Sequence, residues 1–565
     1  MNHPSGGFGH WAMIGWWVVG NAGVDMDGEV RSEGVGKGST ADPPEANIYS
    51  GGPRLADIPE LDLTTFTLRH AGRLADKPAV IDGPSGRALT YGALESSVRS
   101  FAAGLALRGF GKGDTFCVSL PNLPEFPIAF HGVVAAGGRC TTANPLYTVR
   151  ELSHQLAETD ARMVLTASPF VEVAREAAAP TACEVYVVGE TNRAQPFSDL
   201  FGDPEATPDV VVDPANDIAA VLYSGGTTGL PKGVLLSHRN LVVSMVQSEA
   251  AFGLTSDDVV LAVLPFFHVY GLNVILNRAL AAGATIVSMP QFDLEHFLDL
   301  LERYRVTRGY IVSPIALALA THPAVERRDL SDLRHLLCAA AIVSPELLEA
   351  CERRIGCRVT QGYGMTEMSS VTHLAPLFGD VRKPASIGLP VPGTECRLVD
   401  LEAGLDVAPQ EPGELWLRGE HVMRGYLGNP AATAATIDPD GWLHTGDLVV
   451  ADEDGWFRVV ARLKEIIKYK GYQVAPAELE AVLSDHPHVA DCAVIGVPDE
   501  AAGEIPKAFV VPAGDHFDSN AVMQFVNERV APYKRIRRVE TIEEIPKSPS
   551  GRILRRLLEE RDRSV

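Results

Sequence analysis

An apolar run followed directly by a glycine-rich loop constrains the fold of this chain more than any other feature. The run Ile218–Tyr223 is typical of a buried strand, and Ser224–Gly233 then reads Ser-Gly-Gly-Thr-Thr-Gly-Leu-Pro-Lys-Gly. Glycines let backbone N–H groups converge on anionic oxygens, and threonine and lysine add further donors. The spacing is not that of the common P-loop. The pattern predicts a phosphate cradle at a strand end, with an ordinary surface loop as the alternative.

From about Asn47 onward, the pattern predicts an α/β fold. Apolar runs such as Thr115–Leu120 and Val259–Leu264 alternate with helix-like stretches such as Leu94–Leu107 and Leu294–Tyr304. Alternation of this kind places helices on the faces of sheets. With 46% hydrophobic and 21% charged residues, the chain has the composition of a core-forming globular protein.

The sequence predicts three parts along the chain. Residues 45–461 are expected to form a large N-terminal α/β domain with several sheets. Positive charge rises abruptly in Ala461–Gln473. Helix-like stretches over residues 476–484 and 519–530, with strand-like runs between them, predict a small α+β domain over residues 462–565. Residues 1–44 are rich in Gly, Ser, Asp and Glu around one short apolar run, Trp11–Gly20, and are interpreted as a disordered leader. A weak membrane or partner anchor is the alternative.

Charge and cysteine content limit the partners and the compartment. The formal net charge of -23 argues against nucleic acid and anionic membranes as partners, and any anionic ligand such as ATP would have to be held by a local cluster of residues. The one apolar run near the start is too short to span a bilayer. The eight cysteines show neither a Cys-x-x-Cys pair nor the spacing of a zinc site, which indicates a reducing, cytoplasmic setting.

Three further motifs carry polar chemistry. Gln361–Glu367 surrounds an aromatic ring with glycines, so backbone and ring can approach a flat base, and Glu367 is the kind of oxygen ligand that Mg²⁺ takes. Asp447 ends a Thr-Gly-Asp turn, and a carboxylate there can accept from the two hydroxyls of a ribose. His268 follows two phenylalanines and could polarise a carboxylate site. The alternatives are a strand-to-helix turn, a simple Gly-Asp turn and a core histidine.

The last motif lies near the C-terminal end, in Ile545–Arg556. Lys547 stands there between two prolines, and a lysine on a stiff turn is a point charge that can be brought to a reaction and withdrawn. The alternative is a solvated basic tail.

In their order along the chain, these motifs resemble the adenylate-forming superfamily of acyl-CoA synthetases, luciferases and peptide-synthetase adenylation domains. The resemblance covers about residues 47–560 and is greatest to the 4-coumarate–CoA ligases, in Pro265–Asn273, Lys464–Glu480 and Tyr533–Val539. It implies a small mobile C-terminal domain that carries a catalytic lysine. It also implies an ATP-dependent acid–CoA ligase that uses Mg²⁺ and coenzyme A. The enzyme would form acyl-AMP and pyrophosphate, then acyl-CoA and AMP, from an aromatic (4-coumarate-like) or medium-chain carboxylic acid.

The resemblance also implies roles for individual residues. Those expected to bind ATP or AMP are Ser224, Gly225, Gly226, Thr227, Thr228, Lys232, Ala340, Gln361, Gly362, Tyr363, Thr366, Asp447, Arg462, Lys464 and Lys547. Those expected to act in catalysis are Lys547, His268, Thr366, Glu367, Lys468 and Gln473, and Glu367 is also the expected Mg²⁺ ligand. Lys470 and Gly471 are expected on the CoA path, Lys464 at the hinge, and Tyr270, Val274, Gly364 and Val371 in the acyl pocket.

The chain also departs from the ligase pattern. Gly225 replaces a second serine, Ala461 replaces an aspartate beside Arg462, and Gln291 stands where the plant enzymes have a lysine. Val274 and Ser370 differ from the plant phenylpropanoid pocket, and Ala-Ala-Ala-Ile-Val at residues 339–343 replaces Gly-Ala-Ala-Pro-Leu. These differences weaken the case for 4-coumarate itself.

Three other functions remain open at this point. The first is an enzyme that loads the phosphopantetheine of a carrier protein acting in trans. The second is a luciferase-like oxidation. The third is a non-catalytic nucleotide-binding protein, which would require the loss of a catalytic group that this chain retains.

Overall fold

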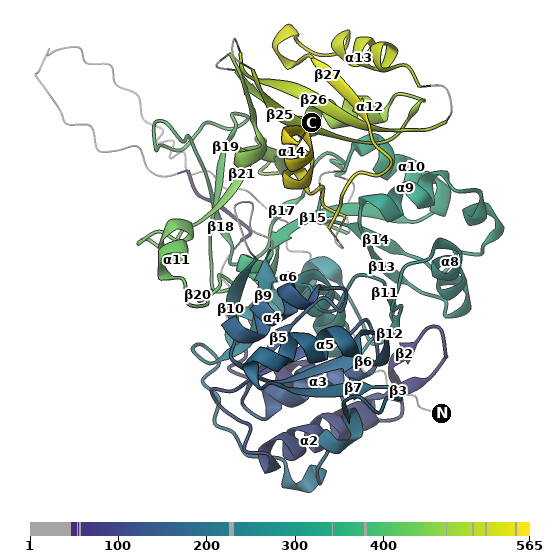
Figure 1. The fold of residues 1–565 in the computed structure, drawn as a ribbon, viewed down its shortest axis with the longest axis vertical. Helices are drawn as coiled ribbons and strands as arrows, with labels where there is room; N and C mark the ends of the chain where they lie inside the picture. Colours follow the sequence, from purple (N-terminus) through teal and green to yellow (C-terminus); the bar gives the residue numbers. More distant parts are fainter. Residues whose placement is uncertain are drawn as a thin grey trace, which may run out of the picture.

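The computed structural model describes residues 47–52, 55, 58–224, 231–341, 343–377, 381–470, 472–499, 502–514, 517–548 and 551–564. Within them the chain forms four sheets with helices on their faces (Figure 1), which confirms the mixed α/β fold. The predicted leader, residues 1–44, lies outside the described residues. No helix in the described ranges is both long and apolar enough to cross a membrane.

The first large sheet has eight strands. One of them, β9, ends at Ser224, the first residue of the predicted phosphate loop. Its strands lie in the order β20 (Gly425–Tyr426), β10 (Lys232–Ser237), β9 (Ile218–Ser224), β5 (Arg139–Thr142), β4 (Thr115–Ser119), β6 (Ala161–Ala167), β7 (Glu184–Val188) and β8 (Gln195–Pro196). The strands from β9 to β8 are parallel, and β10 turns back antiparallel to β9. The helices around it are α2 (Tyr91–Leu107), α3 (Glu125–Ala135), α4 (Val149–Glu158) and α5 (Val171–Ala178).

The second large sheet has nine strands. Their order is β17 (Leu389–Pro390), β16 (Ser370–Leu374), β15 (Arg358–Met365), β14 (His335–Cys338), β13 (Arg308–Ile311), β11 (Val259–Ala262), β12 (Thr285–Ser288), β2 (Pro78–Asp82) and β3 (Ala88–Thr90). The associated helices are α1 (Leu63–Thr67), α6 (His238–Phe252), α7 (Arg278–Ala282), α8 (Leu294–Arg303), α9 (Ser313–Thr321) and α10 (Pro345–Ile355). A π-helix, η5 (Tyr270–Asn277), leads into α7.

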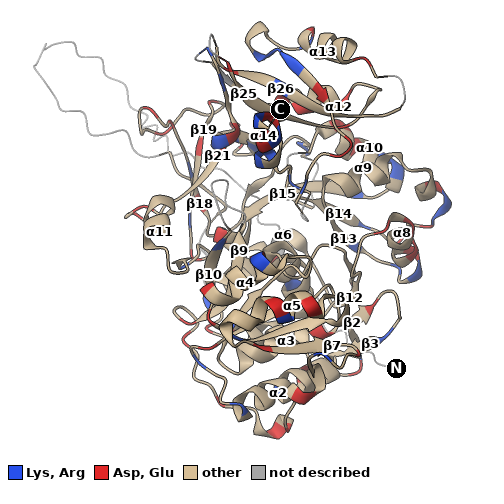
Figure 2. Cartoon of the chain, viewed as in Figure 1, with Lys and Arg blue, Asp and Glu red and all other residues tan. Residues whose placement is uncertain are grey.

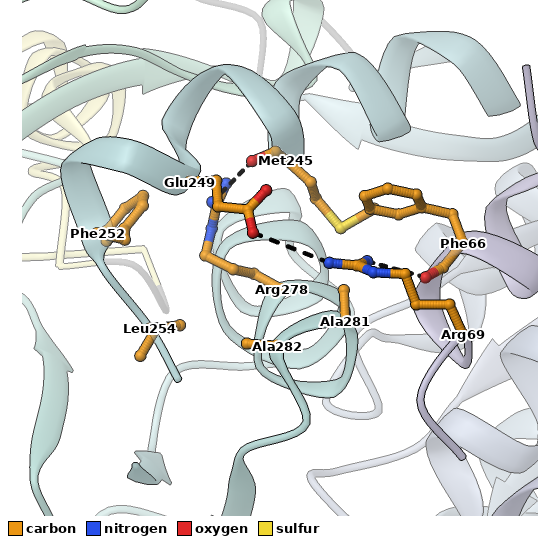
Figure 3. Close-up of a pocket in the computed structure, with 9 residues that line it drawn as sticks. All are labelled: Phe66, Arg69, Met245, Glu249, Phe252, Leu254, Arg278, Ala281 and Ala282. Carbon is orange, nitrogen blue, oxygen red and sulfur yellow. Dashed lines mark hydrogen bonds and ion pairs between the residues drawn. The ribbon is translucent and has the colours of Figure 1, made fainter. Parts of the chain in front are cut away.

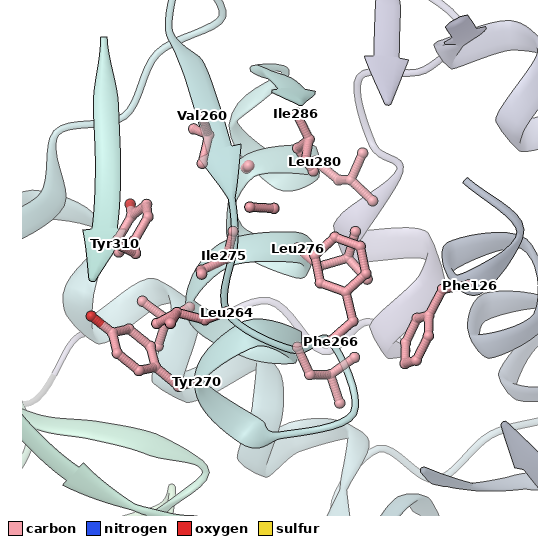
Figure 4. Close-up of a cluster of buried hydrophobic side chains, with 14 of the residues drawn as sticks. Phe126, Val260, Leu264, Phe266, Tyr270, Ile275, Leu276, Leu280, Ile286 and Tyr310 are labelled. Atoms are coloured by element: carbon pink, nitrogen blue, oxygen red, sulfur yellow. The ribbon is translucent and has the colours of Figure 1, made fainter. Parts of the chain in front are cut away.

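One hydrophobic core underlies both large sheets. Figure 4 shows part of it, where Phe126 of α3 lies beside Phe266, and side chains of η5, β11 and β13 continue the same cluster. The rings of Phe126 and Phe266 lie 5.5 Å apart. Because the same core supports the end of β9 and the segment that begins at Tyr270, the predicted phosphate loop and the predicted acyl pocket have a common rigid base.

The third sheet is antiparallel and joins distant parts of the chain. It contains β1 (Tyr49–Ser50), β18 (Glu395–Val399), β19 (Gly413–Arg418), β21 (Leu443–Ala451) and β22 (Phe457–Arg462). Along β21 every second residue is buried, so Asp447 lies on the inward face with its apolar neighbours.

The fourth sheet follows a short turn, η8 (Leu463–Glu465). It consists of β23 (Ile467–Tyr469), β24 (Tyr472–Val474), β25 (Val489–Asp499), β26 (Gly503–Pro512) and β27 (Arg538–Thr541), with α12 (Pro476–Ser484), α13 (Ser519–Asn527) and α14 (Arg555–Arg563). The predicted helix over residues 476–484 matches α12, whereas the one predicted over 519–530 ends three residues earlier, at Asn527. The boundary after residue 461 falls at the end of β22, and its role as a domain boundary stays a prediction.

Candidate active site

The end of the predicted phosphate loop meets the predicted magnesium ligand. Ser224 Oγ, at the end of β9, donates a hydrogen bond of 2.9 Å to Glu367 Oε1. Tyr426 Oη of β20 donates to the same oxygen at 2.9 Å, and Lys232 Nζ lies 4.7 Å from the centroid of the Tyr426 ring. Ser224 and Lys232 are paired across β9 and β10, so they form the base of the loop. Gly225, Gly226, Thr227 and Thr228 lie outside the described residues.

A metal ion at Glu367 would need ligands from elsewhere. In the ranges that the structure describes, no group of three or more His, Cys, Asp or Glu side chains could hold one. Mg²⁺ typically takes one or two carboxylates and completes its shell with phosphate oxygens and water. Glu367, beside the base of a phosphate loop, fits that arrangement. Thr366 precedes it in the same 3-10 turn and is also buried.

Asp447 forms the second polar cluster, with Tyr363 of β15 and Arg462 of β22. Tyr363 Oη donates to Asp447 Oδ2 at 2.5 Å, and Arg462 Nε lies 3.1 Å from Asp447 Oδ1. Oδ1 is buried, yet no donor in the described part of the chain is aligned with it. Burial raises the pKa of the Asp447 carboxyl, and Arg462 and Tyr363 oppose that shift. A buried acceptor without an aligned donor, beside a cation, suits a ligand with neighbouring hydroxyls.

The glycines around Tyr363 have a structural reason besides access for a ligand. β15 and β16 are out of register between Tyr363 and Gly364. A Cβ at Gly364 would lie 1.6 Å from the carbonyl oxygen of Ser370, and one at Gly362 would lie 2.9 Å from Leu374 Cδ2. Glycine is therefore needed for the close approach of the two strands.

Gln361 lies on β15, and Ala340 follows the neighbouring strand β14. Gln361 Nε2 donates to the carbonyl oxygens of Pro384, at 2.6 Å, and Val343, at 3.4 Å, so its amide N–H groups are used by the backbone. Ala340 follows β14 with φ of 75°, in the left-handed region that residues other than glycine rarely adopt.

The predicted acyl-pocket residues lie around the π-helix η5 and the strand β16. Tyr270 and Val274 are buried on η5, and Val371 is buried on β16. Tyr270 Oη donates to Leu337 O at 3.2 Å, and its backbone N–H donates to His268 Nδ1 at 3.2 Å. Part of the His268 ring reaches solvent, but its surroundings are mostly protein, and burial lowers its pKa to about 4. His268 is thus neutral near pH 7.

The residues predicted to serve the second half-reaction gather on one hairpin. Lys468 of β23 is paired directly with Gln473 of β24. Lys470, at the turn, has φ of 49°, and Gly471 lies outside the described residues. Lys464, Lys468 and Lys470 are exposed.

Lys547 contacts a residue that the sequence did not suggest. Its Nζ donates to Asp491 Oδ2 of β25 at 2.6 Å. Further along the same loop, a Cβ at Gly551 would lie 3.1 Å from Pro314 Cδ at the start of α9. The loop that carries Lys547 therefore lies against the N-terminal part of the chain.

Sequence reasoning missed two contributors, Tyr426 and Asp491. Their partners Glu367 and Lys547 lie 59 and 56 residues away, and no local pattern marks such pairs. Only the folded sheets bring them together.

A small crevice lies apart from these residues, between α1, α6 and α7 (Figure 3). Phe66, Met245 and Phe252 contribute to its walls. Arg69 Nη2 lies 3.9 Å from Glu249 Oε1, and Arg278 Nη1 donates to Met245 O at 2.9 Å. None of the predicted site residues lines it.

The distribution of charged residues over the whole molecule does not distinguish the site. Figure 2 shows acidic and basic residues interspersed over the elements, with 72 acidic and 49 basic residues in the full chain. An anionic ligand would accordingly depend on the local groups Lys232, Arg462 and Lys547.

Comparisons with known proteins agree on one family. The model described as AMP-binding enzyme matches residues 68–427, and the model described as AMP-binding enzyme C-terminal domain matches residues 478–552. The chain is 41% identical over 513 residues to 4-coumarate–CoA ligase 1 of Solanum tuberosum, covering 89% of this chain and 94% of that protein. Two solved structures are similar at 27% identity and a TM-score of 0.81. ATP-bound MatB from Rhodopseudomonas palustris covers 89% of this chain and 99% of its own. The anthranilate CoA ligase AuaEII in complex with anthranoyl-AMP covers 90% of this chain and 98% of its own.

Proposed function

The chain belongs to the AMP-binding enzyme family, and we propose that it is an acid–CoA ligase that works through acyl-AMP. ATP and coenzyme A are its co-substrates, and Mg²⁺ is its cofactor. The observation that carries the proposal is the placement of two clusters, Ser224 with Glu367 and Asp447 with Arg462, joined by the single strand-and-turn segment from Tyr363 to Glu367. Such a pair of clusters suits the phosphates and the ribose of one nucleotide.

In the first half-reaction, an oxygen of the substrate carboxylate attacks the α-phosphorus of ATP. The new O–P bond forms as the bond to the β-phosphate breaks, and pyrophosphate leaves. Because both reactants are anionic, catalysis depends on charge neutralisation and in-line positioning. Lys232 and the loop after Ser224 hold the leaving phosphates, Asp447 and Arg462 hold the ribose, and Lys547 neutralises charge between the carboxylate and the α-phosphate.

Glu367 would hold Mg²⁺, which would supply further charge neutralisation for the phosphates. Thr366 contacts the α-phosphate, and Gly362 and Tyr363 lie along the adenine. Neutral His268 lies at the carboxylate end of the acyl pocket, which Tyr270, Val274, Gly364 and Val371 line.

In the second half-reaction, the thiol of coenzyme A attacks the acyl carbonyl and AMP leaves. Lys468 and Gln473 serve this step, with Lys470 and Gly471 along the CoA path. Since Lys547 and the thiol of coenzyme A cannot share one approach to the acyl group, the C-terminal domain turns about Lys464 between the two half-reactions.

The substrate is an aromatic or medium-chain carboxylic acid. The names of the relatives support an aromatic acid like 4-coumarate, while Val274 and Ser370 alter the pocket from the plant pattern. Phosphopantetheine on a carrier protein is the alternative acceptor. All eight cysteines are free and buried, which supports a cytoplasmic location.

The test is pyrophosphate release across a panel of acids, with and without coenzyme A. We expect acid-dependent release with ATP and Mg²⁺, limited to about one turnover without coenzyme A and continuous with it, and acyl-CoA as the product by mass spectrometry. Continuous turnover with a phosphopantetheinylated carrier but not with coenzyme A would favour the alternative acceptor. Absence of acid-dependent release with every acid would refute the proposal.

A further inference from the structure

The ammonium group of Lys547 is held by a carboxylate from a different strand. Asp491 belongs to β25, and its Oδ2 accepts from Lys547 Nζ at 2.6 Å. Its other oxygen, Oδ1, accepts from the backbone N–H of Cys492 at 3.0 Å. One oxygen of the Asp491 carboxylate is thus held by its own strand, and the other accepts from the lysine.

This ion pair has little value for stability. The Lys547 side chain is 27% exposed and that of Asp491 is 36% exposed. Pairs with this much exposure contribute little, because water screens the charges and the long side chains lose conformational freedom. The contact is therefore better explained by a role in orienting the Lys547 side chain.

The backbone of the Lys547 loop is anchored separately. Lys547 is paired with Ile553 in an isolated antiparallel bridge. Arg552 Nη2 donates to Glu465 Oε1 at 3.1 Å, and Gly551 lies against Pro314. The first two contacts hold the loop within the C-terminal domain, the third places it against the N-terminal part of the chain, and Asp491 then sets where the lysine side chain points.

We propose that Asp491 is a positioning residue for the adenylation half-reaction. The inference rests on the proposed function and on the role of Lys547 within it. A lysine ammonium has three N–H donors, and in the described part of the chain Asp491 takes one of them. Two donors are left, one for an oxygen of the substrate carboxylate and one for an oxygen of the α-phosphate. By accepting from the third N–H donor, Asp491 orients the ammonium group of Lys547 before the substrates bind.

Two other roles of Asp491 predict different results. If Asp491 only kept Lys547 away from the substrates, removing its charge would free the lysine and speed adenylation. If Asp491 only stabilised the domain, removing its charge would affect both half-reactions and the thermal stability.

The test compares Asp491→Asn with a matched control, Glu478→Gln. Glu478 forms a 2.7 Å pair with Lys534 in the same domain, at 44% and 22% exposure, and neither residue has been placed in the site. Each variant is assayed for kcat and KM in acid-dependent pyrophosphate release. Thioester formation from preformed acyl-AMP and the Tm are measured in parallel.

We expect Asp491→Asn to lower the kcat of adenylation about tenfold to a hundredfold, the size of effect that a misplaced catalytic group produces. The KM values, the rate of thioester formation and the Tm should stay close to those of the parent. Asp491→Glu should recover part of the loss, and Asp491→Asn should cost little more once Lys547→Ala is present. Glu478→Gln should behave as the parent.

Faster or unchanged adenylation in Asp491→Asn, or equal loss in both half-reactions, would overturn the inference. Failure of the proposed function is distinguishable, because the parent and Glu478→Gln would then release no pyrophosphate either.

Discussion

At the scale of single residues, Asp447 has the most demanding surroundings in the site. It is buried on the inward face of β21, and its charge depends on Arg462 and on the hydroxyl of Tyr363. Burial alone raises the pKa of this carboxyl, so its two partners are what keep the carboxylate form accessible. A ligand that needs a charged acceptor therefore depends on three residues from three strands.

Replacing Asp447 with Asn tests this dependence. The variant keeps the shape but loses the charge, so the hydrogen bonds to ribose hydroxyls weaken. We expect the KM for ATP in pyrophosphate release to rise about tenfold to a hundredfold, the usual cost of a hydrogen bond to a charged group. The KM for the acid should change little, and an equal rise in both KM values would contradict the assignment.

At the scale of elements, the π-helix η5 sets the shape of the predicted acyl pocket. π-helices are rare and occur mostly at functional sites. Gly271 is its second residue, and a Cβ there would lie 2.0 Å from the carbonyl oxygen of Pro265. The first turn of η5 can thus pack onto the preceding segment only with glycine at this position.

We expect Gly271→Ala to push η5 away from Pro265. Overpacking of this kind typically costs about 1–3 kcal/mol, and it would also displace Tyr270, so both the Tm and the affinity for the acid should fall. Gly72→Ala is the control, because a Cβ at Gly72 meets nothing within 4 Å and should leave both quantities unchanged. A normal Tm in Gly271→Ala would show that the contact with Pro265 relaxes easily.

Elements were predictable where the signal is local. Periodicity over Leu94–Leu107 and Pro476–Ser484 gave helices that end where α2 and α12 end. The apolar run ending at Tyr223 predicted β9 with an error of one residue, since the strand ends at Ser224. The need for glycine at position 271 was not predictable, because the close approach to the carbonyl oxygen of Pro265 exists only once η5 has packed.

The site was predictable in part for the same reason. Motifs identified Ser224, Glu367 and Asp447 as candidates, and the resemblance added to their roles. The structure places Ser224 at the end of β9, Glu367 in a 3-10 turn, and Asp447 within β21 and not in the turn that the sequence suggested. Asp491 gave no signal, since an isolated aspartate near the start of a strand is ordinary until the fold brings Lys547 within 2.6 Å.

At the scale of the whole molecule, the proposed hinge at Lys464 lies between two groups of ion pairs. Arg462, before it, pairs with Asp447. Glu465, after it, pairs with Arg552 and Arg555 at 3.1 Å each. A rotation at Lys464 would leave both groups intact, because the partners of each lie on the same side of the pivot.

We expect Lys464→Pro to separate the two half-reactions. Proline fixes φ near −65° and restricts the residue before it, so the rotation is hindered while the arrangement described above is kept. Adenylate formation should remain measurable, and thioester formation should fall by orders of magnitude. Lys464→Ala is the control, and unchanged thioester kinetics in the proline variant would refute the hinge.

The buried histidines predict how the stability of the whole molecule depends on pH. Burial lowers the pKa of His131 to about 4, and that of His335, His373 and His421 to about 3 each. An unfolded histidine takes up a proton below about pH 6.5. The unfolded state thus binds more protons between about pH 6.5 and 4, and stability is lost as the pH falls through that range.

Each of these four groups contributes up to about 1.4 kcal/mol per pH unit in that window. We expect the Tm to be level above about pH 7 and to fall steadily from pH 6.5 to 5. His421→Gln should fall less steeply than the parent. A Tm that stays level down to pH 5 would contradict the neutral, buried state of these rings.

The pairing of β1 with β18 ties the first described residues to the sheet that holds Asp447 and Arg462. Tyr49 is paired with Cys396 and its ring lies 5.3 Å from that of Phe457, while the backbone N–H of Asn47 donates to Asp406 Oδ2. An N-terminal truncation that starts the protein at about residue 60 would therefore remove β1 and leave β18 as an edge strand of this sheet. The bare N–H and C=O groups of β18 could then recruit strands from other molecules, so such a truncated protein should self-associate into aggregates even though every catalytic side chain is present.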